Sequence, residues 1–211
     1  MIYAPIIIPT LNRFEHLKRC INSLQENKWA KYTELYISLD YPPKEYYWEG
    51  YKKIKEYLDA GIKGFKEINL FFQKNNLGPY KNFLFLKNKV IEKYDRFIVT
   101  EDDNEFSPCF IEFMDKGLDI FEKDPDIMCI CGYNAEKNWN SGGGNVLKLS
   151  SLQYHYGSGY WHSKWLRLKD GINNKLFDSI GNNPYYIWKL YYNSRNMLWW
   201  YVHRYLCEPY N

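Results

Sequence analysis

Residues 94–108 read YDRFIVTEDDNEFSP, and this stretch decides how the rest of the chain is interpreted. Residues 96–100 form a short run rich in apolar and β-branched side chains, which predicts a buried strand. Three acidic residues follow at once: Glu101, Asp102 and Asp103. Open α/β sheets bind their ligands at the carboxyl ends of strands. We therefore expect a ligand site where this strand ends.

The three consecutive acids allow two interpretations. Adjacent carboxylates repel one another unless a cation lies between them, and hard divalent cations prefer oxygen ligands. The acids are therefore consistent with a Mg²⁺ or Mn²⁺ site that also holds a phosphate. They are also consistent with a solvated acidic turn in which an Asp or Asn side chain caps the next helix. These residues alone leave both interpretations open.

Strands and helices are predicted to alternate through the first 132 residues. Short apolar runs predict strands at residues 5–8, 34–39, 68–72, 96–100 and 126–132. Apolar residues at helical spacing predict helices at residues 14–27, 45–60, 80–92 and 107–123. This alternation is typical of an α/β fold, in which helices flank a Rossmann-like, mostly parallel sheet. Polar residues after several strands should then meet at one edge of the sheet.

The sequence changes in character after Gly132. Residues 134–145 are polar and include three consecutive glycines, and residues 156–161 read YGSGYW, which predicts a loop leading into a helix at residues 161–170. We expect one domain over residues 1–211, with a first half at 1–132 and a second half at 133–211. The end at Asn211 allows for truncation of that second half.

Composition excludes several classes of protein. The net charge of +3 is too small for a dedicated nucleic-acid binder, so no nucleic-acid partner is expected. No apolar run approaches the ~18 residues of a membrane span. The five cysteines are scattered, as is usual for free thiols in a reducing compartment. We expect a cytoplasmic protein.

Four motifs together resemble the GT-A type of nucleotide-sugar glycosyltransferase. They are PIIIPTLNR at residues 5–13, ISLD at 37–40, NLGPYKN at 76–82 and FIVTEDD at 97–103. The segment around Glu101 to Asp103 is especially similar to the Glu-Asp-Asp segment of N-acetylglucosaminyltransferase I, and bacterial family-2-like transferases share the layout. Four motifs in the right order are much more specific than any one of them.

The resemblance implies a site for a UDP- or dTDP-sugar, with Asp103 as ligand to Mn²⁺ or Mg²⁺. Residues 1–132 would be the nucleotide-binding half and residues 133–211 the acceptor-side half. Asp40 would accept a hydrogen bond from the base, and Asp102 would hold the ribose or sugar. Each has a plainer interpretation as an ordinary turn residue. The implied substrate-binding residues are Thr10, Asn12, Arg13, Asp40, Gly78, Lys81, Asn82, Glu101, Asp102, Gly157, Gly159 and Trp161.

An inverting transfer needs a base that removes the proton of the acceptor hydroxyl. The sequence has no acid where the resembling enzymes place one, and the available carboxylates are Asp178, Glu208 and Asp170. We expect Asp178 to be the base. A truncated chain, or a protein that binds a nucleotide sugar without efficient transfer, would also explain the departure.

The predicted function is transfer of a hexose or N-acetylhexosamine to a glycan or lipid-linked acceptor in surface polysaccharide synthesis. The aromatic stretch at residues 185–206 is interpreted either as a packed amphipathic helix or as an acceptor or peripheral contact at the inner face of the membrane. The alternatives are a non-catalytic nucleotide-sugar-binding protein and a sugar-1-phosphate nucleotidyltransferase. The latter normally begins with a Gly-rich, Lys-containing loop, which residues 9–14 lack.

Overall fold

The computed structural model describes residues 2–133 and 156–166 of the chain. Its contacts divide the chain into two compact units, of which one comprises Met1–Gly132 together with His155–His162. The other comprises Tyr133–Tyr154 and Ser163–Asn211, most of which lies outside the described residues. The fold below is that of the first unit.

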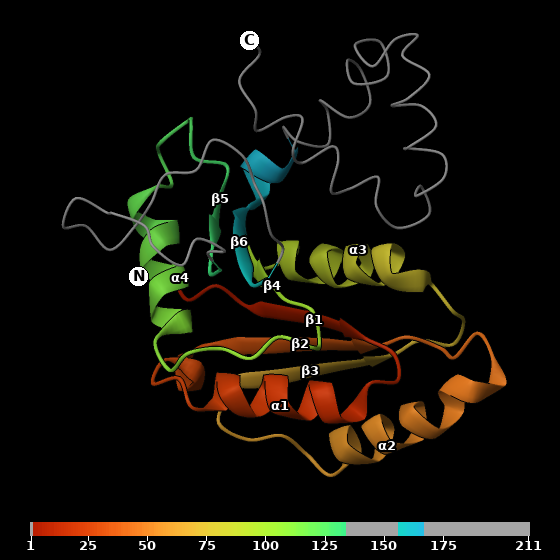
Figure 1. The fold of residues 1–211 in the computed structure, drawn as a ribbon. Coiled ribbons are helices and arrows are strands. Elements are labelled where there is room, and N and C mark those ends of the chain that lie inside the picture. The colour runs from red at the N-terminus through yellow and green to blue at the C-terminus, as the bar shows by residue number, and fades with distance from the viewer. Residues whose placement is uncertain (1, 134–155, 167–211) are drawn as a thin grey trace, which may run out of the picture. The chain divides into compact units, whose positions relative to one another are not determined.

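Strands and helices alternate as predicted (Figure 1). The strands are β1 (Ile6–Thr10), β2 (Glu34–Leu39), β3 (Glu67–Phe72), β4 (Arg96–Val99), β5 (Cys129–Cys131) and β6 (Ser158–Trp161). The α-helices are α1 (Phe14–Gln25), α2 (Trp48–Asp59), α3 (Gly78–Ile91) and α4 (Phe110–Ile120). Short 3-10 helices at Ala30–Tyr32 and Glu45–Tyr47 precede β2 and α2. The predicted helix at 107–123 is shorter in the structure, where Cys109 rather than Ser107 is the residue before it.

The six strands form one sheet in the order β3-β2-β1-β4-β6-β5. The first four in that order run parallel, so their carboxyl ends meet at one edge. β6 runs antiparallel to both of its neighbours, β4 and β5. This sheet confirms the predicted α/β class with mostly parallel strands. We call the edge formed by the carboxyl ends of β1, β2, β3 and β4 the carboxyl edge.

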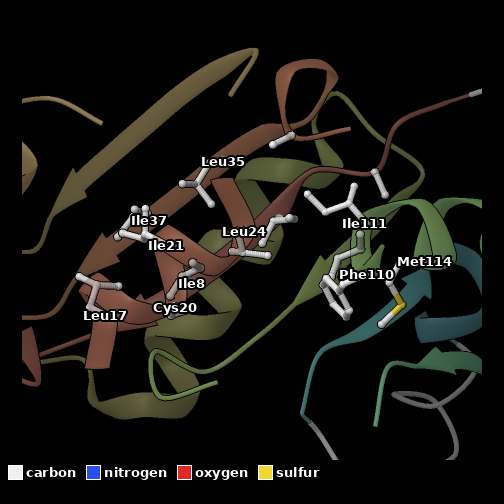
Figure 2. Close-up of a cluster of buried hydrophobic side chains, with 14 of the residues drawn as sticks. Ile8, Leu17, Cys20, Ile21, Leu24, Leu35, Ile37, Phe110, Ile111 and Met114 are labelled. Carbon is white, nitrogen blue, oxygen red and sulfur yellow. The ribbon is translucent and has the colours of Figure 1, made fainter. Parts of the chain in front are cut away.

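Helices cover both faces of the sheet, with α1 and α2 on one face and α3 on the other (Figure 1). The main apolar core lies beneath α1 and α4, where Ile8 of β1 and Ile37 of β2 meet Ile21 of α1 (Figure 2). These three side chains are fully buried. Burial of one such side chain contributes roughly 1.5–3 kcal/mol to folding. The core therefore fixes the strand ends that carry the polar residues.

Within the described residues, no helix is both long and apolar enough to cross a membrane.

Candidate active site at the carboxyl edge of the sheet

The predicted polar residues of β1, β2 and β4 do meet at the carboxyl edge. β1 and β2 pair in parallel up to Thr10 and Leu39, and the backbone N–H of Asp40 donates to the Thr10 carbonyl at 2.9 Å. On the other side of β1, the Thr100 N–H donates to the Ile7 carbonyl at 3.2 Å. This pairing places Asp40 and the acids after Thr100 on either side of the end of β1.

Asp102 and Asp103 both bind Arg13, in the loop between β1 and α1, and Asp102 also binds Thr10 at the end of β1. The Thr10 hydroxyl donates to Asp102 Oδ2 at 2.6 Å, and Arg13 Nη2 donates to Asp102 Oδ1. The second guanidinium nitrogen, Arg13 Nη1, donates to Asp103 Oδ2 at 2.7 Å. The Asp102 side chain is only 5% exposed, whereas those of Asp103 and Arg13 are 31% and 46% exposed. Arg13 therefore bridges a buried carboxylate and a solvent-facing one.

The two carboxylates differ in what they can do. Burial raises the pKa of Asp102, although hydrogen bonds from Thr10 and Arg13 act in the opposite direction. Its contacts with Thr10 at the end of β1 and with Arg13 just before α1 make Asp102 the attachment point of the β1–α1 loop. Asp103 is more accessible to a ligand, and its contact in the loop is with Arg13 alone.

The carboxylates at this edge can be compared with the ligands that a divalent cation needs. Within residues 2–133 and 156–166, no group of three or more His, Cys, Asp or Glu side chains is placed to hold a metal ion. Asp103 supplies one accessible carboxylate, and the side chain of Glu101 is also exposed. A hard cation keeps water or phosphate oxygens when the protein supplies few ligands. These two carboxylates could supply part of the ligand set of such a cation, and Asp103 as a metal ligand stays a prediction.

Asp40 is buried and has four hydrogen-bond donors, all from this chain. Its Oδ1 accepts from the backbone N–H groups of Tyr41 at 2.9 Å and Leu77 at 2.8 Å. Its Oδ2 accepts from the Gly78 N–H at 2.9 Å and from Asn76 Nδ2 at 3.2 Å. A carboxylate offers about four lone-pair positions. The predicted contact with a nucleobase remains a prediction, and in this structure those positions have partners in the protein.

The predicted donor-binding residues of α3 occupy two different environments. Lys81 is exposed, but Asn82 is 1% exposed and exchanges hydrogen bonds with Ser38, whose hydroxyl also accepts from Gln73 Nε2 at 2.9 Å. Asn82 therefore attaches α3 to β2. A direct contact between Asn82 and a donor stays a prediction. Gly78 has φ +75°, a conformation that other residues rarely adopt.

Residues 158–161 form strand β6, where the sequence predicted a loop. Ser158 lies opposite Val99 and Trp161 lies opposite Arg96, so only the start of β6 is at the carboxyl edge. Gly159 packs against Leu118 of α4, and Trp161 Nε1 donates to the Leu118 carbonyl at 3.0 Å. Gly159 and Trp161 thus pack against α4, and their predicted contact with the donor stays a prediction.

Gly157 is the one residue of the predicted glycine-rich loop that lies just before the start of β6. Its φ is +73°, and an added Cβ would come within 2.7 Å of the Phe106 ring. Gly157 thus allows close contact between β6 and the loop that follows the acids. Its predicted role beside the donor sugar stays a prediction.

Other predicted site residues and elements lie outside the described residues. They are the predicted base Asp178, its alternatives Asp170 and Glu208, and the segment 185–206.

The structure also shows residues that the sequence analysis did not select. Gly50 of α2 packs against the loop that precedes α1, where an added Cβ would lie 2.0 Å from the Asn12 carbonyl oxygen. Asn12 itself is half-buried. Gln73, Asn76 and Ser38 complete the hydrogen bonds around the start of α3. The sequence predicted the residues between β3 and α3 only as polar loop residues. Their hydrogen-bond partners could not be predicted, because these are distant in sequence.

A comparison with known families identifies the chain. Residues 6–186 match the family model described as glycosyl transferase family 2. The chain belongs to glycosyltransferase family 2. The match covers the whole described sheet, which confirms the resemblance to GT-A type glycosyltransferases. Within this family 2 chain, the acids of residues 101–103 follow the fourth strand, and Arg13 follows the first.

Comparisons with individual proteins add little to the family assignment. Among solved structures, the crystal structure of S. aureus TarS is similar, with 14% sequence identity and a TM-score of 0.42. The match covers 57% of this chain and 20% of the TarS chain. No curated protein matches the sequence.

Proposed function

We propose that this chain is a metal-dependent, inverting glycosyltransferase. It takes a hexose or N-acetylhexosamine from a UDP- or dTDP-sugar and transfers it to a glycan or lipid-linked acceptor in surface polysaccharide synthesis. The observation that carries the proposal is the set of contacts among Arg13, Asp102 and Asp103 at the carboxyl edge of a family 2 sheet. Ligands of open α/β sheets bind at this edge.

The side chains at the carboxyl edge would have different roles in binding the donor. Asp103 would hold Mn²⁺ or Mg²⁺ together with the donor diphosphate, and Arg13 lies beside it as a second positive charge. The bound cation would stabilise negative charge on the departing nucleoside diphosphate. Asp102 holds the β1–α1 loop through Thr10 and Arg13, which fixes the position of the guanidinium.

The transfer itself is a single displacement. The acceptor oxygen forms a bond to the anomeric carbon, the bond from that carbon to the diphosphate oxygen breaks, and the base takes the acceptor proton. Asp178 is our candidate for this base. In such a displacement, the configuration at the anomeric carbon inverts.

Calorimetric titration tests the donor site. UDP, dTDP and GDP are titrated into the full chain with and without Mn²⁺, for the wild type, Asp103→Asn and Asp59→Asn. Asp59 is a matched control, because it is an exposed aspartate paired with Lys55 at the end of α2. We expect Mn²⁺-dependent binding of UDP or dTDP that Asp103→Asn weakens and Asp59→Asn leaves unchanged. If the wild type binds none of the three nucleotides under either condition, the proposed function is wrong.

A further inference from the structure

The segment that follows the acids is hydrogen-bonded to side chains of α1 and of the turn after it. The Ser23 hydroxyl, on α1, accepts the Phe106 N–H at 3.0 Å. Asn27, just beyond the end of α1, accepts the Ile111 N–H on its Oδ1 at 3.0 Å. The segment therefore runs beside α1 from the carboxyl edge to the start of α4 (Figure 1).

The Ser23 hydroxyl has a fixed orientation. It donates to the Cys20 carbonyl of the same helix at 2.8 Å. A hydroxyl has one proton and two acceptor positions, so this bond uses the proton and leaves the oxygen to accept the Phe106 N–H. Ser23 is half-buried, which limits competition from water. Ser23 thus attaches the backbone at Phe106 to the side of α1.

The side chain of Phe106 is held as well. Its ring stacks on that of Phe110, with 4.1 Å between the ring centroids. On another side it lies close to Gly157, where an added Cβ would come within 2.7 Å of the ring. The backbone bond to Ser23 and these two ring contacts make Phe106 a fixed point of the chain.

Asp103 lies on a short stretch between two fixed points. Asp102, on one side, is held by Thr10 and Arg13. Phe106, on the other side, is held by α1. Between them, Glu105 pairs with an arginine of α1, but both side chains of that pair are more than half exposed, and such pairs contribute little. The bond at Phe106 therefore restricts residues 103–105 more than that ion pair does.

We propose that Ser23 is a positioning residue for Asp103, the metal ligand of the proposed function. It fixes the Phe106 backbone and so keeps residues 103–105 in place at the carboxyl edge. A ligand that adopts its binding position for only part of the time binds with an affinity reduced by that fraction. Loss of the Ser23 hydroxyl should therefore weaken metal binding. This role rests on the proposed function, whereas the attachment of Phe106 to α1 does not.

Asn27 offers a matched control. It is buried, and like Ser23 it accepts a backbone N–H of the segment after the acids. Its partner Ile111 lies in the first turn of α4, beyond Phe106, so loss of the Asn27 side chain leaves the Phe106 bond in place. Asn27 Nδ2 also donates to the Ser23 carbonyl at 3.0 Å. The control therefore shows whether any disturbance close to Ser23 has the same effect.

The experiment compares wild type, Ser23→Ala, Ser23→Thr and Asn27→Ala as full chains, at a temperature where urea denaturation shows all four to be folded. Alanine favours a helix more than serine does, so Ser23→Ala should not weaken α1 itself. Amide hydrogen exchange is followed by NMR at Phe106 and Ile111. Electron paramagnetic resonance measures the binding of Mn²⁺ in the presence of saturating UDP or dTDP.

We expect Ser23→Ala to speed exchange at Phe106 by about two- to tenfold, because it removes the acceptor of one hydrogen bond. Its affinity for Mn²⁺ should fall by at least about twofold, and by no more than the factor seen in exchange. Ser23→Thr keeps the hydroxyl and should match wild type in both measurements. Asn27→Ala should speed exchange at Ile111 and leave the affinity for Mn²⁺ unchanged.

Four results would overturn the proposal. The first two are unchanged exchange at Phe106 and unchanged Mn²⁺ affinity in Ser23→Ala. The third is an equal loss of Mn²⁺ affinity in Asn27→Ala, which would indicate general loosening. The fourth is a Ser23→Thr variant that binds Mn²⁺ as weakly as Ser23→Ala. If the wild type binds no Mn²⁺ with either nucleotide, the proposed function fails together with the metal role, and exchange at Phe106 still decides whether Ser23 holds the segment.

Discussion

Arg13 Nη1 lies 2.7 Å from Asp103 Oδ2, across 90 positions of sequence. This contact places a fixed positive charge on the carboxylate that we propose as the metal ligand. A divalent cation that binds Asp103 must either share the carboxylate with Arg13 or displace it. We therefore expect Arg13 to compete with a metal ion for Asp103.

Replacement of Arg13 by Gln should strengthen Mn²⁺ binding in the absence of nucleotide. An exposed ion pair is worth about 0.2–1 kcal/mol, so the expected gain in affinity is about 1.4- to fivefold. Electron paramagnetic resonance of free Mn²⁺ measures it directly. Arg19→Gln is the control, because Arg19 forms a comparable exposed pair with Glu105 at 2.8 Å. An equal gain in both variants would show a general charge effect and not competition at Asp103.

Gly50→Ala should destabilise the protein. In an exposed helix this change would favour folding by about 1 kcal/mol. Here the added Cβ would lie 2.0 Å from the Asn12 carbonyl oxygen, so α2 must move away from the loop that carries Arg13. We expect a net loss of about 1–3 kcal/mol in the free energy of unfolding, measured by urea denaturation. Lys52→Ala, at an exposed position of the same helix, is the control. A gain in stability would contradict the predicted clash.

Glu34, at the start of β2, should stabilise the fold in a pH-dependent way. Its burial acts to raise the pKa, but hydrogen bonds from Lys93, Lys66 and two tyrosines outweigh this and lower the pKa from 4.5 to about 2. A lowered carboxyl pKa contributes stability that is fully present above pH 4.5 and is lost as the pH falls towards 2.

Glu34→Gln should therefore cost about 1–3 kcal/mol at pH 7 and show less loss of stability between pH 4.5 and 2. The lower figure allows for screening, because the two lysines are half exposed. The measurement is urea denaturation across this pH range. Glu67→Gln provides the comparison, since Glu67 is exposed and lies 4.0 Å from the same Lys93. Parallel pH curves for wild type and Glu34→Gln would refute the prediction.

Asp115 of α4 should lower the stability of the fold at neutral pH, which is the opposite of the effect expected for Glu34. Burial raises the pKa of Asp115 to about 7, although the Ala4 N–H donates to its Oδ1 at 2.9 Å and Arg96 lies near enough to oppose the shift. Asp119 adds to it. Its Oδ2 has no partner among the described residues. A carboxyl with a raised pKa lowers stability progressively as the pH rises from about 4 to 7.

Asp115→Asn keeps the acceptor for Ala4 and removes the buried charge. The variant should gain up to about 4 kcal/mol relative to wild type at pH 8, and little at pH 4. Thermal and urea unfolding at the two pH values give the comparison, with Asp59→Asn as the exposed control. Equal stability differences at pH 4 and pH 8 would mean that Asp115 does not titrate in this range.

Local patterns were sufficient to predict most of the sheet. The apolar runs that became β1 and β2 are buried along most of their length, so their hydrophobicity was a direct signal. The acids after β4 could be placed at the carboxyl edge for the same reason. The contact between Arg13 and these acids depends on two loops at that edge, and the sequence predicted only that the loops would be neighbours.

The remaining differences come from tertiary contacts. β6 contains Gly159 next to its aromatic residues, and Gly157 directly precedes it. Glycine has low strand propensity, so the segment resembled a loop. It is a strand because Phe97 and Tyr160 pair across the β4–β6 ladder. Likewise, no pattern around Asp40 indicates that it caps a helix 37 positions later. Such hydrogen bonds depend on the fold and could not be predicted from the sequence.

The return of the chain at β6 has a consequence for how this protein can diversify. The Gly132 N–H donates to the Gly157 carbonyl at 2.8 Å, so the chain leaves the sheet after β5 and rejoins it one strand away. Closing a loop between two such fixed points costs only about 0.6 kcal/mol more for each doubling of its length. The intervening segment can therefore lengthen, shorten or be exchanged between relatives while β4 and its acids stay in register.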